Sequence, residues 1–95
     1  MTMHIGTLTV TLYLHAAESL KDKRSVVKSL VETTRRKFNV SIAEVDDLDK
    51  QRRATIGIAC VANDVRYLNG VLDKVVDFLE SDPAVEVGEV ALELL

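Results

Sequence analysis

The stretch IGTLTVTLYL, residues 5–14, alternates between apolar side chains at even positions and mostly threonine at odd positions. Leu8, Val10, Leu12 and Leu14 therefore share one face. Successive side chains of a β-strand point to opposite faces, so this pattern predicts a strand with one buried side. A sheet of this kind needs cover on one face only, and the rest of the chain must supply it.

The next segment, SLKDKR at residues 19–24, has the features of a helix start. Ser19 and Asp22 have the spacing of a capping box. The residues that follow repeat with the period of a helix, and their apolar side consists of Val26, Val27, Leu30, Val31, Thr34 and Phe38. This pattern predicts an amphipathic helix that ends near Asn39.

The remaining segments repeat this combination of strands and a helix. Residues 40–45 and 54–61 read as strands joined by a polar hairpin. Asn63 is a suitable N-cap for a second helix, which ends before Pro83. In the last strand the apolar side chains change from odd to even positions at Gly88, which predicts a β-bulge there.

The resulting order, βαββαβ, contains two split β-α-β units. Right-handed crossovers favour a ferredoxin-like α+β fold, with an antiparallel sheet in the strand order 4-1-3-2 and both helices on one face. We expect residues 1–95 to form one domain, since a chain of 95 residues has material for a single core.

Charge is unevenly distributed along the chain. The net charge is −3, yet residues 21–37 hold seven of the twelve cations, and residues 63–95 hold eight acids against Arg66 and Lys74. The overall charge argues against a generally basic nucleic-acid binder. The composition, a lone Cys60 and the lack of a leader-like segment predict a soluble, cytoplasmic protein without membrane contact.

The cations of the first helix differ in how they suit the helix dipole. Arg35, Arg36 and Lys37 fall in the last turn, where positive charge is favourable, whereas Lys21, Lys23 and Arg24 fall in the first, where it is not. The hairpin should bring Arg52 and Arg53 close to this end. The candidate contacts for an anion or RNA are Lys21, Lys23, Arg24, Lys28, Arg52 and Arg53. The alternative is a solvated surface with mutual ion pairs.

Residues for other chemistry are scarce. His4 and His15 lack cysteine or glutamate partners at zinc-ligand spacing, and Cys60 continues an alternation into the sheet interior. We expect no catalytic residues, metal or cofactor. The open sheet face would carry Tyr13 as its single aromatic, which disfavours base stacking. That face of small residues suits either solvent or a homodimer.

Three segments carry a resemblance to a known family. They are SLKDKRSVVKSL (19–30), FNVSIAEV (38–45) and RATIGIA (53–59), and they resemble the YlxP-like family of uncharacterised bacterial proteins. The resemblance implies a ferredoxin-like fold, no established enzymatic activity, and a gene often found among those for translation factors and ribosome-binding factor A. The family usually carries a tryptophan near position 51, where this chain has Gln51.

We therefore expect a non-enzymatic accessory factor in translation or ribosome assembly, with ribosomal RNA or ribosomal particles as partner. The alternative is a regulatory or ligand-binding homodimer that uses the open sheet face. A third reading, an acylphosphatase-like enzyme, ranks last because residues 15–18 lack a glycine-rich phosphate cradle.

Overall fold

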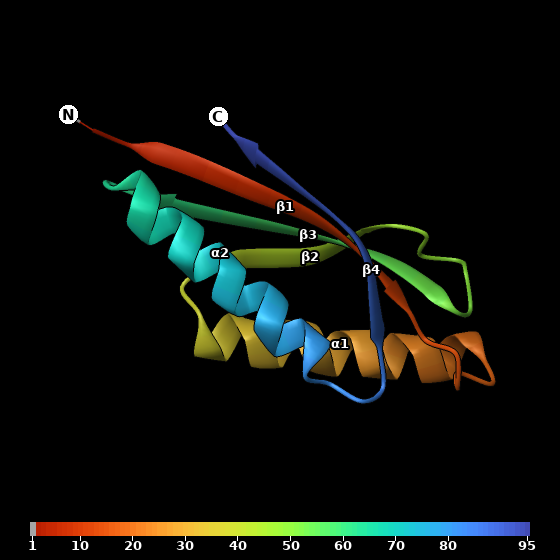
Figure 1. Cartoon of the computed structure of the whole chain (residues 1–95). Helices are drawn as coiled ribbons and strands as arrows, with labels where there is room; N and C mark the ends of the chain where they lie inside the picture. The colour runs from red at the N-terminus through yellow and green to blue at the C-terminus, as the bar shows by residue number, and fades with distance from the viewer. Residues whose placement is uncertain (1) are drawn as a thin grey trace.

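Two helices lie on one face of a four-stranded antiparallel sheet (Figure 1). The computed structural model describes residues 2–95. The elements in chain order are β1 (His4–Tyr13), α1 (Leu20–Lys37), β2 (Ser41–Asp46), β3 (Arg53–Ala62), α2 (Val65–Glu80) and β4 (Glu86–Leu94). The strand order β2-β3-β1-β4 matches the predicted one, so the ferredoxin-like α+β fold is confirmed.

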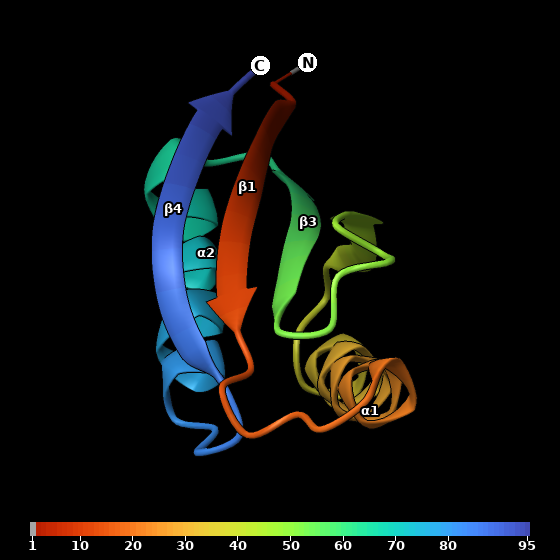
Figure 2. The ribbon, with the colours of Figure 1, turned by 90° about the vertical axis from the view of Figure 1, so that its right-hand side faces the viewer.

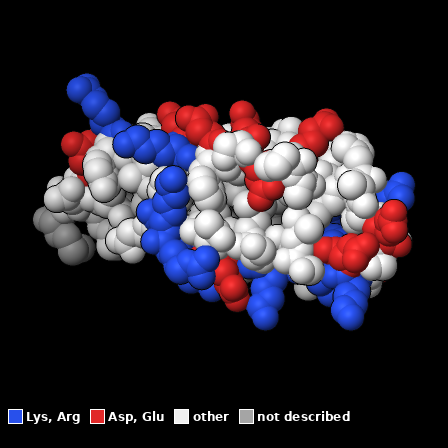
Figure 3. Space-filling model, turned by 90° about the horizontal axis from the view of Figure 1, so that it is seen from below, with Lys and Arg blue, Asp and Glu red and all other residues white. Residues whose placement is uncertain are grey.

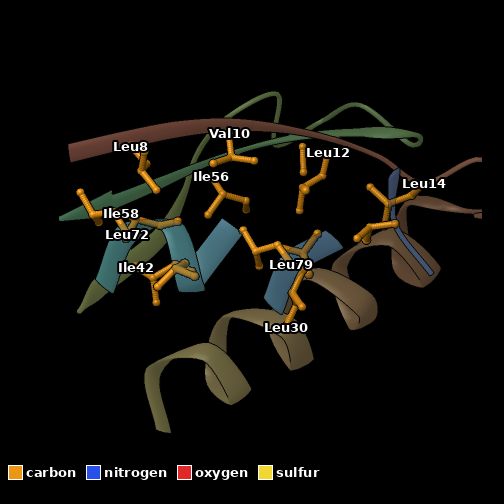
Figure 4. Packing of buried hydrophobic residues seen from close by; sticks show 14 of the residues in the cluster. Leu8, Val10, Leu12, Leu14, Leu30, Ile42, Ile56, Ile58, Leu72 and Leu79 are labelled. Atoms are coloured by element: carbon orange, nitrogen blue, oxygen red, sulfur yellow. The ribbon is translucent and has the colours of Figure 1, made fainter. Parts of the chain in front are cut away.

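The core forms between the even-numbered side of β1 and the helices. Leu8, Val10 and Leu12 are at most 4% exposed, and Figure 4 shows them pointing from β1 toward the helices. The helices contribute Val27 and Leu30 from α1, and Leu68, Leu72, Val75 and Leu79 from α2. Burial of each such side chain stabilises the fold by about 1.5–3 kcal/mol.

The two helices cover different parts of the sheet. α2 packs against β1 and β3 and, less extensively, against β4, whereas α1 packs against β2. Figure 2 shows α2 behind β1 and β4, with α1 seen almost along its axis on the side of β3. The outer border of β4 is therefore the part of the sheet farthest from α1.

The predicted β-bulge in the last strand is confirmed. Val10 pairs with Val90 and Leu12 with Val87, so Gly88 and Glu89 lie opposite the single residue Thr11. A Cβ atom on Gly88 would lie 2.5 Å from Cε2 of Tyr13. Glycine at this point lets the Tyr13 ring pack directly over the bulge.

The predicted start of the second helix is wrong by one residue. Asp64, not Asn63, is the N-cap, and its carboxylate accepts hydrogen bonds from the amides of Arg66 and Tyr67. Both residue types suit this position, so the sequence alone did not separate them. Among residues 2–95, neither helix combines the length and the apolar composition that crossing a membrane requires.

Candidate functional site

The N-terminal end of α1 is closed by its own polar side chains. The Ser19 hydroxyl accepts a hydrogen bond from the Asp22 amide at 3.0 Å, and the Asp22 carboxylate accepts one from the Glu18 amide at 3.1 Å. The predicted cap is thus present, with Glu18 in place of Ser19 as the second donor. The Asp22 carboxylate also suits the positive end of the helix dipole.

Lys23 is fully buried, with 0% of its side chain exposed. Its Nζ lies 2.5 Å from Oε2 of Glu44 on β2 and donates to the carbonyl oxygens of Asp47 at 2.9 Å and Leu48 at 3.4 Å. The ammonium group thus has three acceptors, which compensate for its removal from water. Lys23 joins the first turn of α1 to the end of β2 and the hairpin loop.

Lys23 was placed among the candidate contacts for an anion or RNA, but its side chain has no exposed surface to offer a ligand. Lys23 shares the buried side of α1 with Val27, Leu30 and Thr34. These positions follow the i, i+4, i+7, i+11 spacing of one helix face. The sequence signal was present, but the general rule that lysines are exposed masked it.

The hairpin loop docks against the segment before α1. The side chains of Gln51 and Arg52 both donate to the carbonyl oxygen of Ala17, each at 3.0 Å, and the Leu14 amide donates to the Arg52 carbonyl. The predicted approach of the hairpin to the start of the helix is confirmed. Gln51 thus has a specific contact in this chain.

Asp47 organises the turn after β2. Its φ of 61° lies in the left-handed region, which aspartate tolerates better than most residues. Its carboxylate accepts a hydrogen bond from Thr55 Oγ1 at 2.7 Å and lies 3.1 Å from Nε of Arg53. The Thr55 hydrogen bond, with help from the charges of Arg53 and Lys50, lowers the pKa of Asp47.

The other candidate cations lie on the surface. Lys21, Arg24 and Lys28 are exposed along the outer side of α1, and within residues 2–95 none of them has a carboxylate within 4.0 Å. Arg52 and Arg53 are exposed on the hairpin, each with one side-chain contact to the protein. Of the six candidates, Lys21, Arg24 and Lys28 are thus the ones whose side chains have neither an ion pair nor a hydrogen bond to the protein within residues 2–95.

A shallow groove of about 320 Å³ runs between α1 and β2 beside these cations. Arg24, Lys28 and Arg35 line it together with apolar side chains and two glutamates. Arg35 was assigned only to the helix dipole in the sequence, but it also donates to the Ile42 carbonyl at 3.0 Å. Figure 3 shows most basic side chains along one long border and one end, and a row of acidic ones along the opposite border.

The side chains of His15 and Cys60, which could serve in catalysis or metal binding, make contacts within the fold. His15 Nε2 lies 2.8 Å from Oε2 of Glu86, and its ring stacks on Tyr13 with centroids 6.1 Å apart. Cys60 is buried as predicted, and burial raises the pKa of its thiol. In the described part of the chain, no three histidine, cysteine or acidic side chains are grouped as metal ligands.

Comparison with known proteins places the chain in a family. The model of a family described as "Protein of unknown function (DUF503)" matches residues 5–92. The chain belongs to this family. The DUF503 match runs from β1 into β4 and so includes the α1 cations, the hairpin and Lys23.

The chain is also similar to an uncharacterized protein, YlxP, of Bacillus subtilis strain 168. The two are 35% identical over 82 residues, which cover 86% of this chain and 89% of the relative. This finding confirms the resemblance drawn from the sequence. The name of this relative assigns it no activity.

Proposed function

We propose that this DUF503 protein is a non-enzymatic accessory factor that binds the RNA of ribosomal particles through the outer side of α1. The observation that supports this proposal is the row of cations Lys21, Arg24 and Lys28, which have no carboxylate within 4.0 Å in the described residues 2–95. Amphipathicity requires polar side chains at these positions, but it does not require that they share one sign and lack acidic partners.

The geometry of α1 suits a phosphate backbone. Lys21, Arg24, Lys28 and Arg35 are spaced at i, i+3, i+7 and i+14, so they project from one side of the helix. At 1.5 Å per residue they extend over about 21 Å, enough to contact several successive phosphates. The groove between α1 and β2 lies beside these cations, but Glu32 and Glu44 also line it, so we expect the phosphates to contact the exposed side of α1 and not the groove.

The open sheet face is poorly suited to recognise bases by stacking. Tyr13 is its aromatic residue, and that ring already packs on Gly88 and stacks on His15. Without free aromatic rings the contacts would be to phosphate rather than to bases. We therefore expect binding with little sequence preference and a strong dependence on salt.

Cosedimentation with ribosomal particles over a series of salt concentrations tests this function. The double variant Arg24→Ala/Lys28→Ala should weaken binding and lower the slope of log K against log salt concentration by about 0.7–0.9 per lost contact. The matched control is Arg66→Ala/Lys74→Ala, which removes two exposed cations from α2. Equal effects of the two double variants, or no association at low salt, would refute the proposal.

A homodimer through the open sheet face is the second candidate. Val45 and Val61 are 55% and 58% exposed, and Val45 contacts the position of Gly57 on that face. A dimer would bury both valines. Equilibrium sedimentation of the wild type and of Val45→Lys tests this, because a charge on the face should dissociate the dimer. A monomer at all concentrations removes this candidate.

A further inference from the structure

β4 is an edge strand with a regular, unblocked section. It pairs with β1 on one side and is last in the strand order. After the bulge, residues 90–94 pair with residues 10–6 of β1 without a further shift in register. This section contains neither proline nor lysine, the residues that commonly protect an edge. Its outer side presents backbone donors and acceptors to an incoming strand.

An apolar groove runs between this edge and α2. It has a volume of about 630 Å³, and its apolar lining is formed by Leu8, Leu72, Val76, Val90 and Leu92. Val90 and Leu92 are 43% and 53% exposed, although they face the same side as the core residues of β1. α2 lies behind β4 and β1 (Figure 2), but it packs less extensively on β4 than on β1, and Val90 and Leu92 stay partly exposed.

Acidic side chains lie both in this groove and on the opposite face of β4. Asp73 and Asp77 of α2 line it, and so does Asn69, whose buried Oδ1 has no hydrogen-bond partner in residues 2–95. Glu89 and Glu93 alternate with the apolar residues of β4 and therefore lie on its other face. None of these four acids has a basic side chain within 4.0 Å in the described chain.

We propose that β4 binds an extended segment of a partner protein as a fifth strand, in which apolar residues alternate with lysine or arginine. A strand has two faces, and so does the edge that would receive it. Apolar side chains on one face would fill the groove beside Val90 and Leu92. Basic side chains on the other would lie beside Glu89 and Glu93.

The charges disfavour the two other occupants of such an edge. A second copy of β4 would bring its own Glu89 and Glu93 next to these glutamates, and like charges across a strand pair are destabilising. An RNA strand would meet carboxylates instead of the cations of α1. A basic protein segment is the occupant that matches both the pattern and the charge.

A synthetic ten-residue peptide that alternates valine and lysine is a direct probe. Titration into the ¹⁵N-labelled protein should shift the amide resonances of residues 89–94 and of the α2 residues that line the groove. A peptide with the same five valines and five lysines in two blocks has equal charge but no two-faced pattern. We expect it to bind about tenfold more weakly, because each of its faces carries both valine and lysine, so neither face matches the groove or the glutamates along its whole length.

Two variants test the residues on each face. Glu89→Gln/Glu93→Gln removes two exposed charges and should lower the affinity for the alternating peptide by about threefold to tenfold. Leu92→Thr keeps strand propensity and should lower it through loss of the groove wall. The matched control Glu18→Gln/Glu32→Gln removes two exposed acids that lie outside β4 and α2, and it should leave the affinity unchanged.

Three outcomes would overturn the proposal. They are equal binding of the alternating and block peptides, resonance shifts confined to residues outside β4 and α2, and association of the protein with itself through β4 in place of peptide binding. Circular dichroism of each variant shows whether the fold is kept. If Leu92→Thr does not fold, the proposal is still tested by the two Glu→Gln double variants and by the comparison of the alternating and block peptides.

Discussion

Nζ of Lys23 and Oε2 of Glu44 lie 2.5 Å apart, although the two residues belong to different elements and one is fully buried. The same ammonium group holds two carbonyl oxygens of the hairpin loop. One side chain thus fixes the start of α1, the end of β2 and the turn that carries Arg52 and Arg53.

Replacement of Lys23 should therefore be costly. Lys23→Met leaves Glu44 and two carbonyls without their donor, and we expect the free energy of unfolding to fall by about 3 kcal/mol. Urea denaturation measures it. Lys21→Met removes an exposed lysine two residues away and should change the value by less than about 0.5 kcal/mol. Similar losses in both variants would contradict the buried role.

A double-mutant cycle separates the pair from its surroundings. Glu44→Leu alone leaves the Lys23 ammonium without its charged partner, so it should also destabilise the protein. In Lys23→Met/Glu44→Leu no buried charge remains, and the double variant should be more stable than the sum of the single losses predicts. Simple additivity would show that the two side chains do not interact.

The lowered pKa of Asp47 predicts that the free energy of unfolding depends on pH. Its pKa is lower in the folded protein than in the unfolded chain, so its carboxylate stabilises the fold fully above the unfolded pKa. This contribution is lost as the pH falls through the folded pKa. Asp47→Asn, which also tolerates the positive φ, should lower stability at neutral pH and flatten the decline in acid.

Unfolding curves recorded between neutral pH and about pH 3 give the free energy of unfolding as a function of pH for each variant. Asp49→Asn is the control, because it removes a carboxylate from the same loop and leaves the contact between Asp47 and Thr55 intact. The same flattening in both variants would mean that the hydrogen bond from Thr55 is not its cause.

Two glycines should respond to alanine with opposite signs. A Cβ on Gly6 would lie 2.9 Å from Cδ1 of Leu72, so Gly6→Ala should destabilise the core by about 1–3 kcal/mol. A Cβ on Gly70 would meet nothing within 4 Å. Gly70→Ala in the interior of α2 should therefore stabilise the protein by up to about 1 kcal/mol. Thermal unfolding of both variants checks the signs.

Cys60 should be unreactive in the folded protein. Its thiol is buried, and its raised pKa reduces the thiolate that attacks alkylating reagents. Modification by iodoacetamide at neutral pH should be much slower than that of free cysteine and should reach the free rate in denaturant. Rapid modification without denaturant would show that this end of β3 opens readily.

Simple periodicities predicted most of the fold. The alternation in residues 8–14 and the helix repeat from Val26 to Phe38 each fix which side is buried, because burial follows backbone geometry directly. The bulge at Gly88 followed from the change of parity in the last strand. These signals are local, so one sequence is enough to read them.

The role of Lys23 was not predicted, because it depends on acceptors more than twenty residues away. The helix repeat places Lys23 on the buried side, but only the folded hairpin supplies Glu44 and the two carbonyls. The exposed apolar side of β4 was also missed. Its alternation resembles that of β1, and nothing local shows that α2 leaves Val90 and Leu92 partly exposed.

The separation of charge between α1 and the border formed by β4 and α2 gives the molecule an electric dipole moment across its short dimension. The molecule measures 48 × 20 × 18 Å, so the two charged borders lie on opposite sides of a narrow body. In the field of a polyanion this dipole produces a torque that turns α1 toward the polyanion before contact. In that orientation the edge of β4 points away from the polyanion.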